Sequence, residues 1–337
     1  TVSGTEFVAK DEIKALINSF TTMGYTDLNS FGASLDSSQF FSGRDVLLLS
    51  SSIQATLSDK MINGTSGELV VPDVNVNTTD PVRITQTDVT YIDKTEIEAI
   101  LDALEELGLT DFAALSFDAA NIFTVDFNIL FASASIQATV SENILQNAED
   151  ETVTAGTVTL IVPTYFREDI LIDSVSGKQI ELTELIALLD SLDALGADFG
   201  GGMSPSTITS MSDAQLDELL ASGSVHTTID NMLRGNANIS AVIPDLAKEN
   251  LAYQTNITTA AEIKAFIKST QLISTGSIAD VSIDLGTIAA LSPTDQDTVV
   301  NSMIIRNSIT PLLESTVASD PFNSYVNSLV LLDSNFT

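Results

Sequence analysis

Residues 96–108 read EIEAILDALEELG, and the chain repeats this frame of a leading glutamate, spaced apolar residues and a closing small residue. The other copies are EIKALINSFTTMG at 12–24, ELIALLDSLDALG at 184–196 and EIKAFIKSTQLIS at 262–274. The apolar residues recur at the spacing of one face of an α-helix, and not with the alternation of a strand. We therefore expect four amphipathic helices, each beginning near its glutamate.

Capping signals border these helices. The expected N-caps, whose side chains would accept orphan backbone amides, are Asp11, Thr95 and Thr183. The glutamate after each of them would complement the dipole of its own helix, and Thr95 with Glu98 has the spacing of a capping box. The expected left-handed C-caps are Gly24, Gly108 and Gly196.

A second block begins 41, 40, 41 and 43 residues after the four glutamates. Its copies are IQATLS at 53–58, IQATVS at 136–141, VHTTID at 225–230 and IRNSIT at 305–310. Apolar residues in steps of four predict a second helix. Its Ser and Thr hydroxyls are expected to bond back to the preceding helical turn, and the alternative is a row of hydroxyls offered to a ligand.

Short β-rich runs complete the pattern. They are LVVP at 69–72, LIVP at 160–163, AVIP at 241–244 and LVLL at 329–332. These runs are predicted to be strands, and a further strand, such as 89–92, is predicted before each first helix. The expected fold class is α+β, with four tandem strand-helix-helix-strand modules at 1–87, 88–175, 176–255 and 256–337, the last one divergent. Because short turn-like stretches join the modules, we expect an elongated and stiff repeat array.

The composition excludes several classes of function. The 337 residues include 46 acidic and 13 basic side chains, for a net charge of -33, with one His and no Cys. Binding of nucleic acid or of anionic membranes needs a basic surface, so neither partner is expected. Disulfides, and zinc sites built on thiolates or paired histidines, are impossible. No apolar run approaches the ~20 residues of a membrane span. The chain begins at Thr1, which suggests a processed chain or an excised segment.

His226 occupies a position of the second block where the other copies have Gln54, Gln137 and Arg306. This mixture of polar residues indicates a solvated helix position, so we expect no catalytic role for the histidine.

One segment has the alternating oxygen ligands of a calcium loop: Asp73, Asn75 and Asn77. The glycine and the closing glutamate of such a loop are missing. The segment therefore predicts either a divalent-cation site, with Ca²⁺ as the ion, or a strand whose valines point inward. No other cofactor is expected.

The glutamate helix, the IQAT block and the VVP run together cover nearly the whole chain. They resemble in style the tandem modules of large bacterial cell-surface proteins, adhesin-like or layer- and filament-forming, which are acidic and cysteine-free. The resemblance implies a non-enzymatic structural protein, extracellular or at the cell surface, that acts as a stalk, a spacer or a self-assembling subunit. One alternative is a ligand-binding adhesin using the variable segments 112–126 or 200–212. Another is a secreted hydrolase, which would need two carboxylates facing each other across a cleft.

If the strands of successive modules pair, one strand at each end of the chain lacks a partner. These end strands are Glu6, Phe7 and Val8 at the start and Leu329, Val330 and Leu331 at the end. Strand addition between them is predicted to join chains head to tail.

Overall fold

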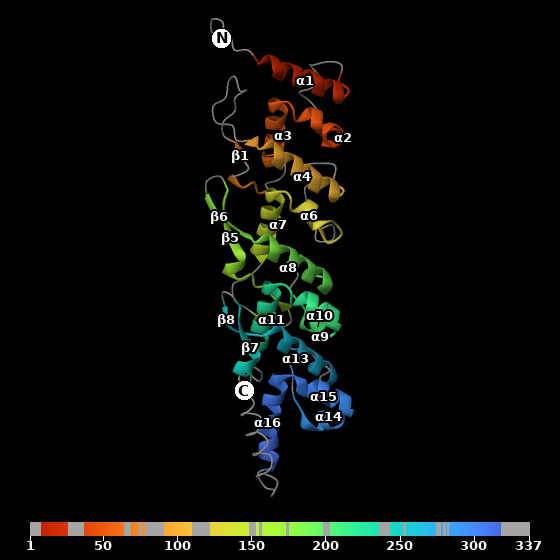
Figure 1. The fold of residues 1–337 in the computed structure, drawn as a ribbon, viewed down its shortest axis with the longest axis vertical. Coiled ribbons are helices and arrows are strands. Elements are labelled where there is room, and N and C mark those ends of the chain that lie inside the picture. Colours follow the sequence, from red (N-terminus) through yellow and green to blue (C-terminus); the bar gives the residue numbers. More distant parts are fainter. Residues whose placement is uncertain are drawn as a thin grey trace. The chain divides into compact units, whose positions relative to one another are not determined.

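The computed structural model describes residues 8–25, 37–63, 69–73, 76–77, 91–109, 122–147, 153–154, 157–172, 175–197, 203–235, 243–251, 254–273, 278, 281 and 283–317. The chain divides into two compact units, one of residues 1–146 with 166–186 and one of residues 147–165 with 187–337. Both are mostly helical with a few short strands, so the fold is α+β in a loose sense (Figure 1). Within the described residues, no helix is long and apolar enough to span a membrane.

The first unit contains most of the chain up to the middle of α8. Its helices are α1 (Lys10–Thr22), α2 (Ser37–Leu47), α3 (Ser51–Asn63), α4 (Lys94–Glu106), α6 (Phe127–Leu130) and α7 (Ala134–Asn147). Its strands are β1 (Val76–Asn77), β2 (Tyr91–Ile92), β5 (Arg167–Ile172) and β6 (Val175–Ile180). Helix α8 (Leu182–Leu195) begins here and ends in the second unit.

The second unit contains the remaining described helices. They are α9 (Pro205–Thr209), α10 (Asp213–Leu219), α11 (Gly223–Gly235), α13 (Ala260–Ile273), α14 (Leu285–Ala289), α15 (Pro293–Asn301) and α16 (Met303–Val317). The strands are β3 (Val153–Thr154), β4 (Thr157–Val158), β7 (Lys248–Leu251) and β8 (Gln254–Thr258). Two single-turn 3₁₀ helices, Thr164–Phe166 and Asp245–Ala247, precede β5 and β7.

Every strand pair in the described residues is antiparallel: β1 with β2, β3 with β4, β5 with β6, and β7 with β8. In the β5–β6 pair, the register runs from Arg167 opposite Ile180 to Ile172 opposite Val175. The predicted strands before α4, α8 and α13 are therefore confirmed as β2, β6 and β8.

The runs 69–72 and 160–163 are not strands, contrary to the prediction. They are buried, with Val162 fully covered. Their high β-propensity accompanies burial here, and one backbone amide of each run binds a side chain, as described below. The run 329–332 lies outside the described residues.

The three predicted glycine C-caps are confirmed. Gly24, Gly108 and Gly196 have φ of 75°, 69° and 60°. After α1, the Gly24 amide donates to the Thr21 carbonyl and the Tyr25 amide to the Phe20 carbonyl, which is the Schellman arrangement. The same two bonds end α4 and α8.

The predicted N-caps are wrong. Helices α1, α4 and α8 begin at Lys10, Lys94 and Leu182, so the expected caps lie within the first turn. Residue Asp93 holds the cap position of α4 without a side-chain bond, and Glu98 forms no capping box with Thr95 but pairs with Lys94 at 3.4 Å. The early start places the glutamate third in each first helix.

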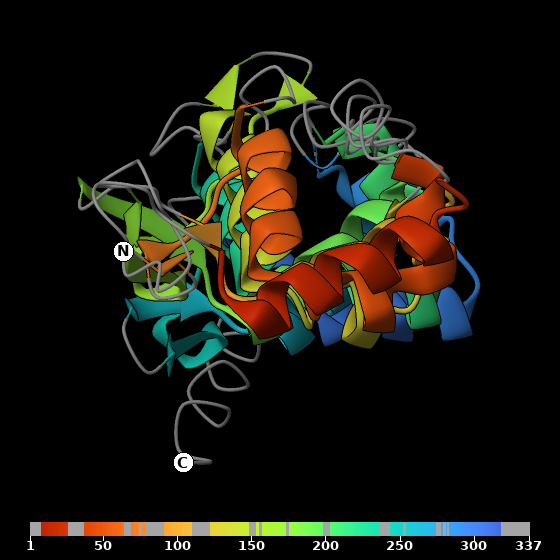
Figure 2. The same cartoon turned by 90° about the horizontal axis from the view of Figure 1, so that it is seen from above.

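In the first unit, α1 packs on both α2 and α3. Seen from above, α1 lies across the end of α3 (Figure 2). Helix α4 packs in turn on α2 and α3, and α6 packs on α4. In the second unit, α13 packs on α9, α10 and α11 and also on α15 and α16. A first helix therefore contacts elements that precede it and elements that follow it.

Candidate functional site

The glutamate of each first helix is buried. Exposed fractions are 6% for Glu12, Glu96 and Glu184 and 3% for Glu262. The Glu12 carboxylate accepts hydrogen bonds from Ser50 Oγ at 2.6 Å and from the backbone amides of Ser52 at 2.9 Å and Ser51 at 3.1 Å. These amides belong to the start of α3, so Glu12 caps a helix that begins almost 40 residues later.

Two further glutamates make the same contact. Glu262 accepts from Ser302 Oγ at 2.7 Å and from the amides of Met303 and Ile304 at 3.0 and 2.9 Å, at the start of α16. Glu96 accepts from Ser133 Oγ at 2.7 Å and the Ser135 amide at 2.8 Å, at the start of α7. The glutamate lies in the first turn of its own helix, as predicted, and its carboxylate also lies at the positive end of a second helix, which was not predicted.

A fully buried serine is the N-cap of each second helix. These serines are Ser50, Ser133, Ser222 and Ser302. Each hydroxyl accepts the amide three residues later, at 3.2 to 3.3 Å. Where the serine also donates to the glutamate, the serine and the carboxylate form one network that accepts hydrogen bonds from the backbone amides at the start of the second helix.

The first helix also binds the end of the helix before the cap. Ser19 Oγ lies 3.4 Å from the Val46 carbonyl near the end of α2. Ser191 donates to the Leu219 carbonyl of α10 at 3.2 Å, and Ser269 to the Val299 carbonyl of α15 at 3.1 Å. Ala103 takes this position in α4 and is fully buried. Helices α1 and α13 therefore each bind a carbonyl at the end of the helix before the bend and the amides at the start of the helix after it.

Hydrogen bonds set the charge state of Glu12. Burial raises its pKa, whereas the Ser50 hydroxyl and the Ser52 and Ser51 amides lower it, and together these bonds bring the pKa below the ordinary value of 4.5. The carboxylate is therefore ionised at neutral pH and strengthens the cap.

Side chains of the second helices bind the strand before the next first helix. The Ile92 amide donates to Ser58 Oγ of α3 at 2.9 Å, and the Thr258 amide donates to Asp230 Oδ1 of α11 at the same distance. Gln137 Nε2 of α7 donates to the Ile180 carbonyl at 3.1 Å. These bonds connect residues on either side of the expected module boundaries.

His226 lies in this contact and not in solvent. It is 4% exposed, and its Nε2 donates to the Thr258 carbonyl at 2.6 Å. Gln137, at the equivalent position, is 7% exposed. The predicted solvated position is wrong here, because the polar side chain is needed as a donor to a buried carbonyl.

Hydroxyls in every copy of the second block bond back to the preceding turn, as predicted, although the buried Ser141 hydroxyl has no partner. Thr139 and Thr228 donate to the carbonyls of Ser135 and Ser224, both at 2.7 Å. The same oxygens accept the amides of the 69–72 and 160–163 runs: Val70 to Thr139 at 2.8 Å and Ile161 to Thr228 at 2.9 Å. The hydroxyls therefore also take the place of a strand partner.

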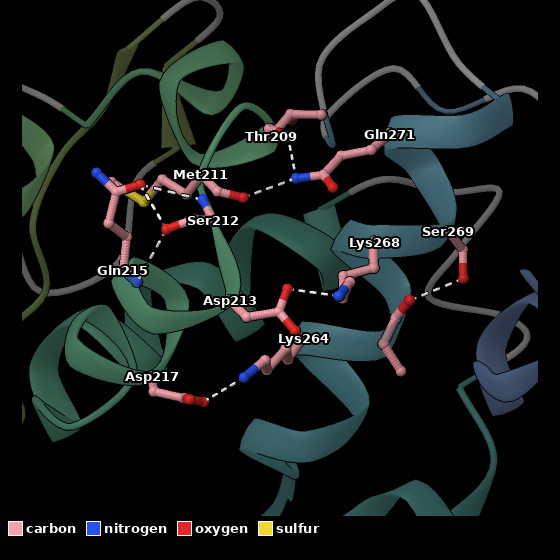
Figure 3. A network of polar contacts seen from close by, with 11 residues as sticks. Thr209, Met211, Ser212, Asp213, Gln215, Asp217, Lys264, Lys268, Ser269 and Gln271 are labelled. Carbon is pink, nitrogen blue, oxygen red and sulfur yellow. Dashed lines mark hydrogen bonds and ion pairs between the residues drawn. The ribbon is translucent and has the colours of Figure 1, made fainter. Parts of the chain in front are cut away.

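Charged and polar side chains join α13 to the helices before it (Figure 3). Lys264 pairs with Asp217 of α10 at 2.6 Å, and Lys268 pairs with Asp213 at 2.5 Å. Gln271 Nε2 donates to the carbonyls of Thr209 at 2.7 Å and Met211 at 2.9 Å. In the first unit, Arg44 of α2 pairs with Asp102 of α4.

The predicted calcium ligands are only partly described. Asp73 is half-buried, Asn75 lies outside the described residues, and Asn77 belongs to β1, where it pairs with Tyr91. Among the described residues, no group of three or more His, Asp or Glu is placed to hold a metal ion. The calcium site stays a prediction.

The other expected sites are also partly described. Of the end strands, Val8 is described and exposed, whereas Glu6, Phe7 and 329–331 lie outside the described residues. Of the variable segments, 203–212 includes α9 and supplies the carbonyls bound by Gln271.

Sequence reasoning missed the glutamate–serine pairs. The signal was available, since a serine lies three residues before the lead apolar residue of every second block. It was overlooked because cap motifs are defined by local spacing, and here glutamate and serine lie 37 to 40 residues apart.

Comparison with protein-family models, curated proteins and solved structures finds no match.

Proposed function

We propose that the chain is a non-enzymatic structural repeat protein of the cell exterior or surface. In this proposal, four modules at 1–87, 88–175, 176–255 and 256–337 stack into a stiff, elongated array. The array acts as a stalk or spacer, or as the subunit of a filament or layer.

The observation that carries the proposal is the recurrence of the same contacts at equivalent sequence positions. The glutamate–serine cap occurs at Glu12, Glu96 and Glu262, and the contact between a second helix and the following strand occurs at Ile92, Ile180 and Thr258. Bonds that repeat within and between modules are typical of arrays in which each repeat contacts its neighbours.

The use of the buried polar groups supports a structural role. Buried ionisable side chains are candidates for catalysis when they line a cleft with perturbed pKa values. Here Glu12, Glu96 and Glu262 cap helices, and Asp230 and His226 bind backbone groups of β8. Each of them has a structural task at a helix end or a junction.

Small-angle X-ray scattering of the purified chain tests the array. A compact protein of this length would have a radius of gyration of about 20 Å, and a stiff array is expected to exceed this clearly. The double variant His226→Ala, Asp230→Ala should make the chain more flexible, whereas Glu218→Gln, on the exposed side of α10, should leave the scattering unchanged. A value near that of a compact protein would contradict the proposal. Protease treatment of intact source cells tests the location, since a surface protein is cleaved without lysis.

A further inference from the structure

Three large apolar side chains are exposed at the start of the described chain. Val8, Ile13 and Ile17 are 36%, 44% and 52% exposed. They lie on or just before α1, and Ile13 and Ile17 follow Glu12 by one and five positions, so they share one face of the helix.

The residues at the same template positions in the other copies are fully buried. They are Ile92, Ile180 and Thr258 for Val8, Ile97, Leu185 and Ile263 for Ile13, and Leu101, Leu189 and Ile267 for Ile17, all 0% exposed. The elements that carry them pack on earlier helices: α4 on α2 and α3, and α13 on α9, α10 and α11. The face of α1 therefore has the pattern of a surface that a preceding module covers.

Two large apolar side chains of the last described helices are likewise exposed at template positions that are buried in the other copies. Val300 and Leu313 are 36% and 41% exposed. Their counterparts are Leu48, Phe131 and Leu220 for Val300, at 1% to 9% exposed, and Met61, Ile144 and Leu233 for Leu313, all at 0%. Thr310 of α16 has the position of Ser58 and Asp230, whose oxygens accept a strand amide.

The charges at these two surfaces are complementary. Lys14 follows its glutamate by two residues, as Lys264 does, and Asp297 precedes an apolar pair by two, as Asp217 does. Lys264 and Asp217 form an ion pair at 2.6 Å (Figure 3). Lys14 is 62% exposed and approaches Asp11 only at 3.8 Å, and Asp297 is exposed. The two ends thus carry the two halves of an ion pair seen inside the second unit.

We propose that the two surfaces bind each other between copies of this chain. The N-terminal face is formed by Val8, Ile13, Lys14 and Ile17, and the C-terminal face by Asp297, Val300, Thr310 and Leu313. The partner is a second copy, since its C-terminal face combines exposed apolar residues with the acidic charge that α13 meets on α10 in the second unit. Because the surfaces differ, the contact is heterologous and propagates into a linear assembly. This inference rests on the proposed structural function and identifies a second copy of the chain as the partner in the assembly.

Sedimentation velocity of the full chain over a concentration series tests the contact. The wild type is expected to form oligomers that grow with concentration and with added salt, because salt screens the repulsion between chains of net charge -33. Ile17→Asp and Leu313→Asp should each raise the dissociation constant at least about tenfold. Leu171→Asp is the matched control, since Leu171 of β5 is 51% exposed and lies outside both faces.

Mixing the two variants gives the sharpest result. Ile17→Asp keeps its C-terminal face and Leu313→Asp keeps its N-terminal face, so the mixture should form one-to-one dimers and nothing larger. Circular dichroism of each variant separates a lost contact from a lost fold. A wild type that stays monomeric up to about 1 mM would overturn the inference, as would oligomers insensitive to both variants. If scattering then showed an elongated monomer, the proposed structural function would still hold, and only the contact between copies would be refuted.

Discussion

Removing the Glu262 carboxylate should unfold the start of α16. Its Oε1 accepts the Ser302 hydroxyl and the Ile304 amide, and its Oε2 accepts the Met303 amide. The side chain is 3% exposed, so water replaces these bonds poorly. Hydrogen bonds to a charged group contribute about 1.5–3 kcal/mol each, and they are not additive within one network. For Glu262→Ala we expect a loss of about 3–5 kcal/mol, because the Ser302 hydroxyl and two backbone amides lose their buried acceptor.

Glu262→Gln separates charge from size. The amide retains an oxygen for Ser302 and Ile304, but its NH₂ group faces the Met303 amide, so one charge-assisted bond becomes a donor–donor contact. The expected cost is about 1.5–3 kcal/mol. Glu218→Gln removes the same charge from an exposed position of α10 and should change stability by less than about 0.5 kcal/mol.

Hydrogen exchange followed by mass spectrometry is the appropriate assay. The chain has two compact units, so one global free energy of unfolding is not defined, whereas exchange reports on α16 itself. A loss of about 3 kcal/mol or more corresponds to exchange at least about 100-fold faster in Glu262→Ala. The capping argument is refuted if exchange in α16 changes no more in Glu262→Ala than in Glu218→Gln.

The remaining predictions concern pH, a buried donor, a helix C-cap and salt. The folded pKa of Glu12 lies below its ordinary value of 4.5, so the stability that its carboxylate contributes is complete above pH 4.5 and is lost as the pH falls through the folded pKa. Amide exchange in α3 should become faster in that pH range, and Glu12→Gln should abolish this pH dependence. His226→Phe leaves the Thr258 carbonyl without its donor and should cost about 1–3 kcal/mol, whereas His226→Gln should be tolerated because Gln137 makes the equivalent bond; exchange in β8 distinguishes the two. Gly108→Ala meets nothing within 4 Å but forces a side chain onto φ of 69°, so amide exchange in α4 should become faster by the amount that a local loss of about 1–2 kcal/mol gives. Melting temperature should also rise with salt, which screens the net charge of -33, and an unchanged value would contradict that reading.

Predictions from local patterns succeeded where the partners are local. The apolar spacing placed the first helices, and the Schellman bonds after Gly24 join residues only five apart or fewer. The back-bonded hydroxyl of Thr139 reaches a carbonyl one turn away. In each case the sequence window contains both partners, so residue type and spacing are sufficient.

The candidate site was predicted less well because its partners are distant in sequence. Glu96 has the residue type expected in a first turn, where it would act on its own helix dipole, but burial turns it toward Ser133, 37 residues away. His226 has a polar type that usually indicates solvent, but it meets a backbone carbonyl 32 residues away. In the 69–72 run, strand propensity was wrongly interpreted as pairing with another strand, since the run is buried and Thr139 binds the Val70 amide from 69 residues away.

The apolar template is shared by all copies, whereas the charges at the contacts between helices are not. In the first unit the base is on the earlier helix, because Arg44 of α2 faces Asp102 of α4. In the second unit the acid is on the earlier helix, α10, and the base is on α13, where Lys268 has the template position of Asp102. Packing α13 on α2 would bring Lys268 toward Arg44, so like charges oppose exchange of the modules. In the proposed contact, Asp297 of one copy and Lys14 of the next would have the polarity of the contact between α10 and α13, with the acid on the earlier helix. In the proposed end-to-end contact, charge would therefore favour the correct pairing of the two surfaces over a misplaced one, although exposed ion pairs contribute little to the strength of binding.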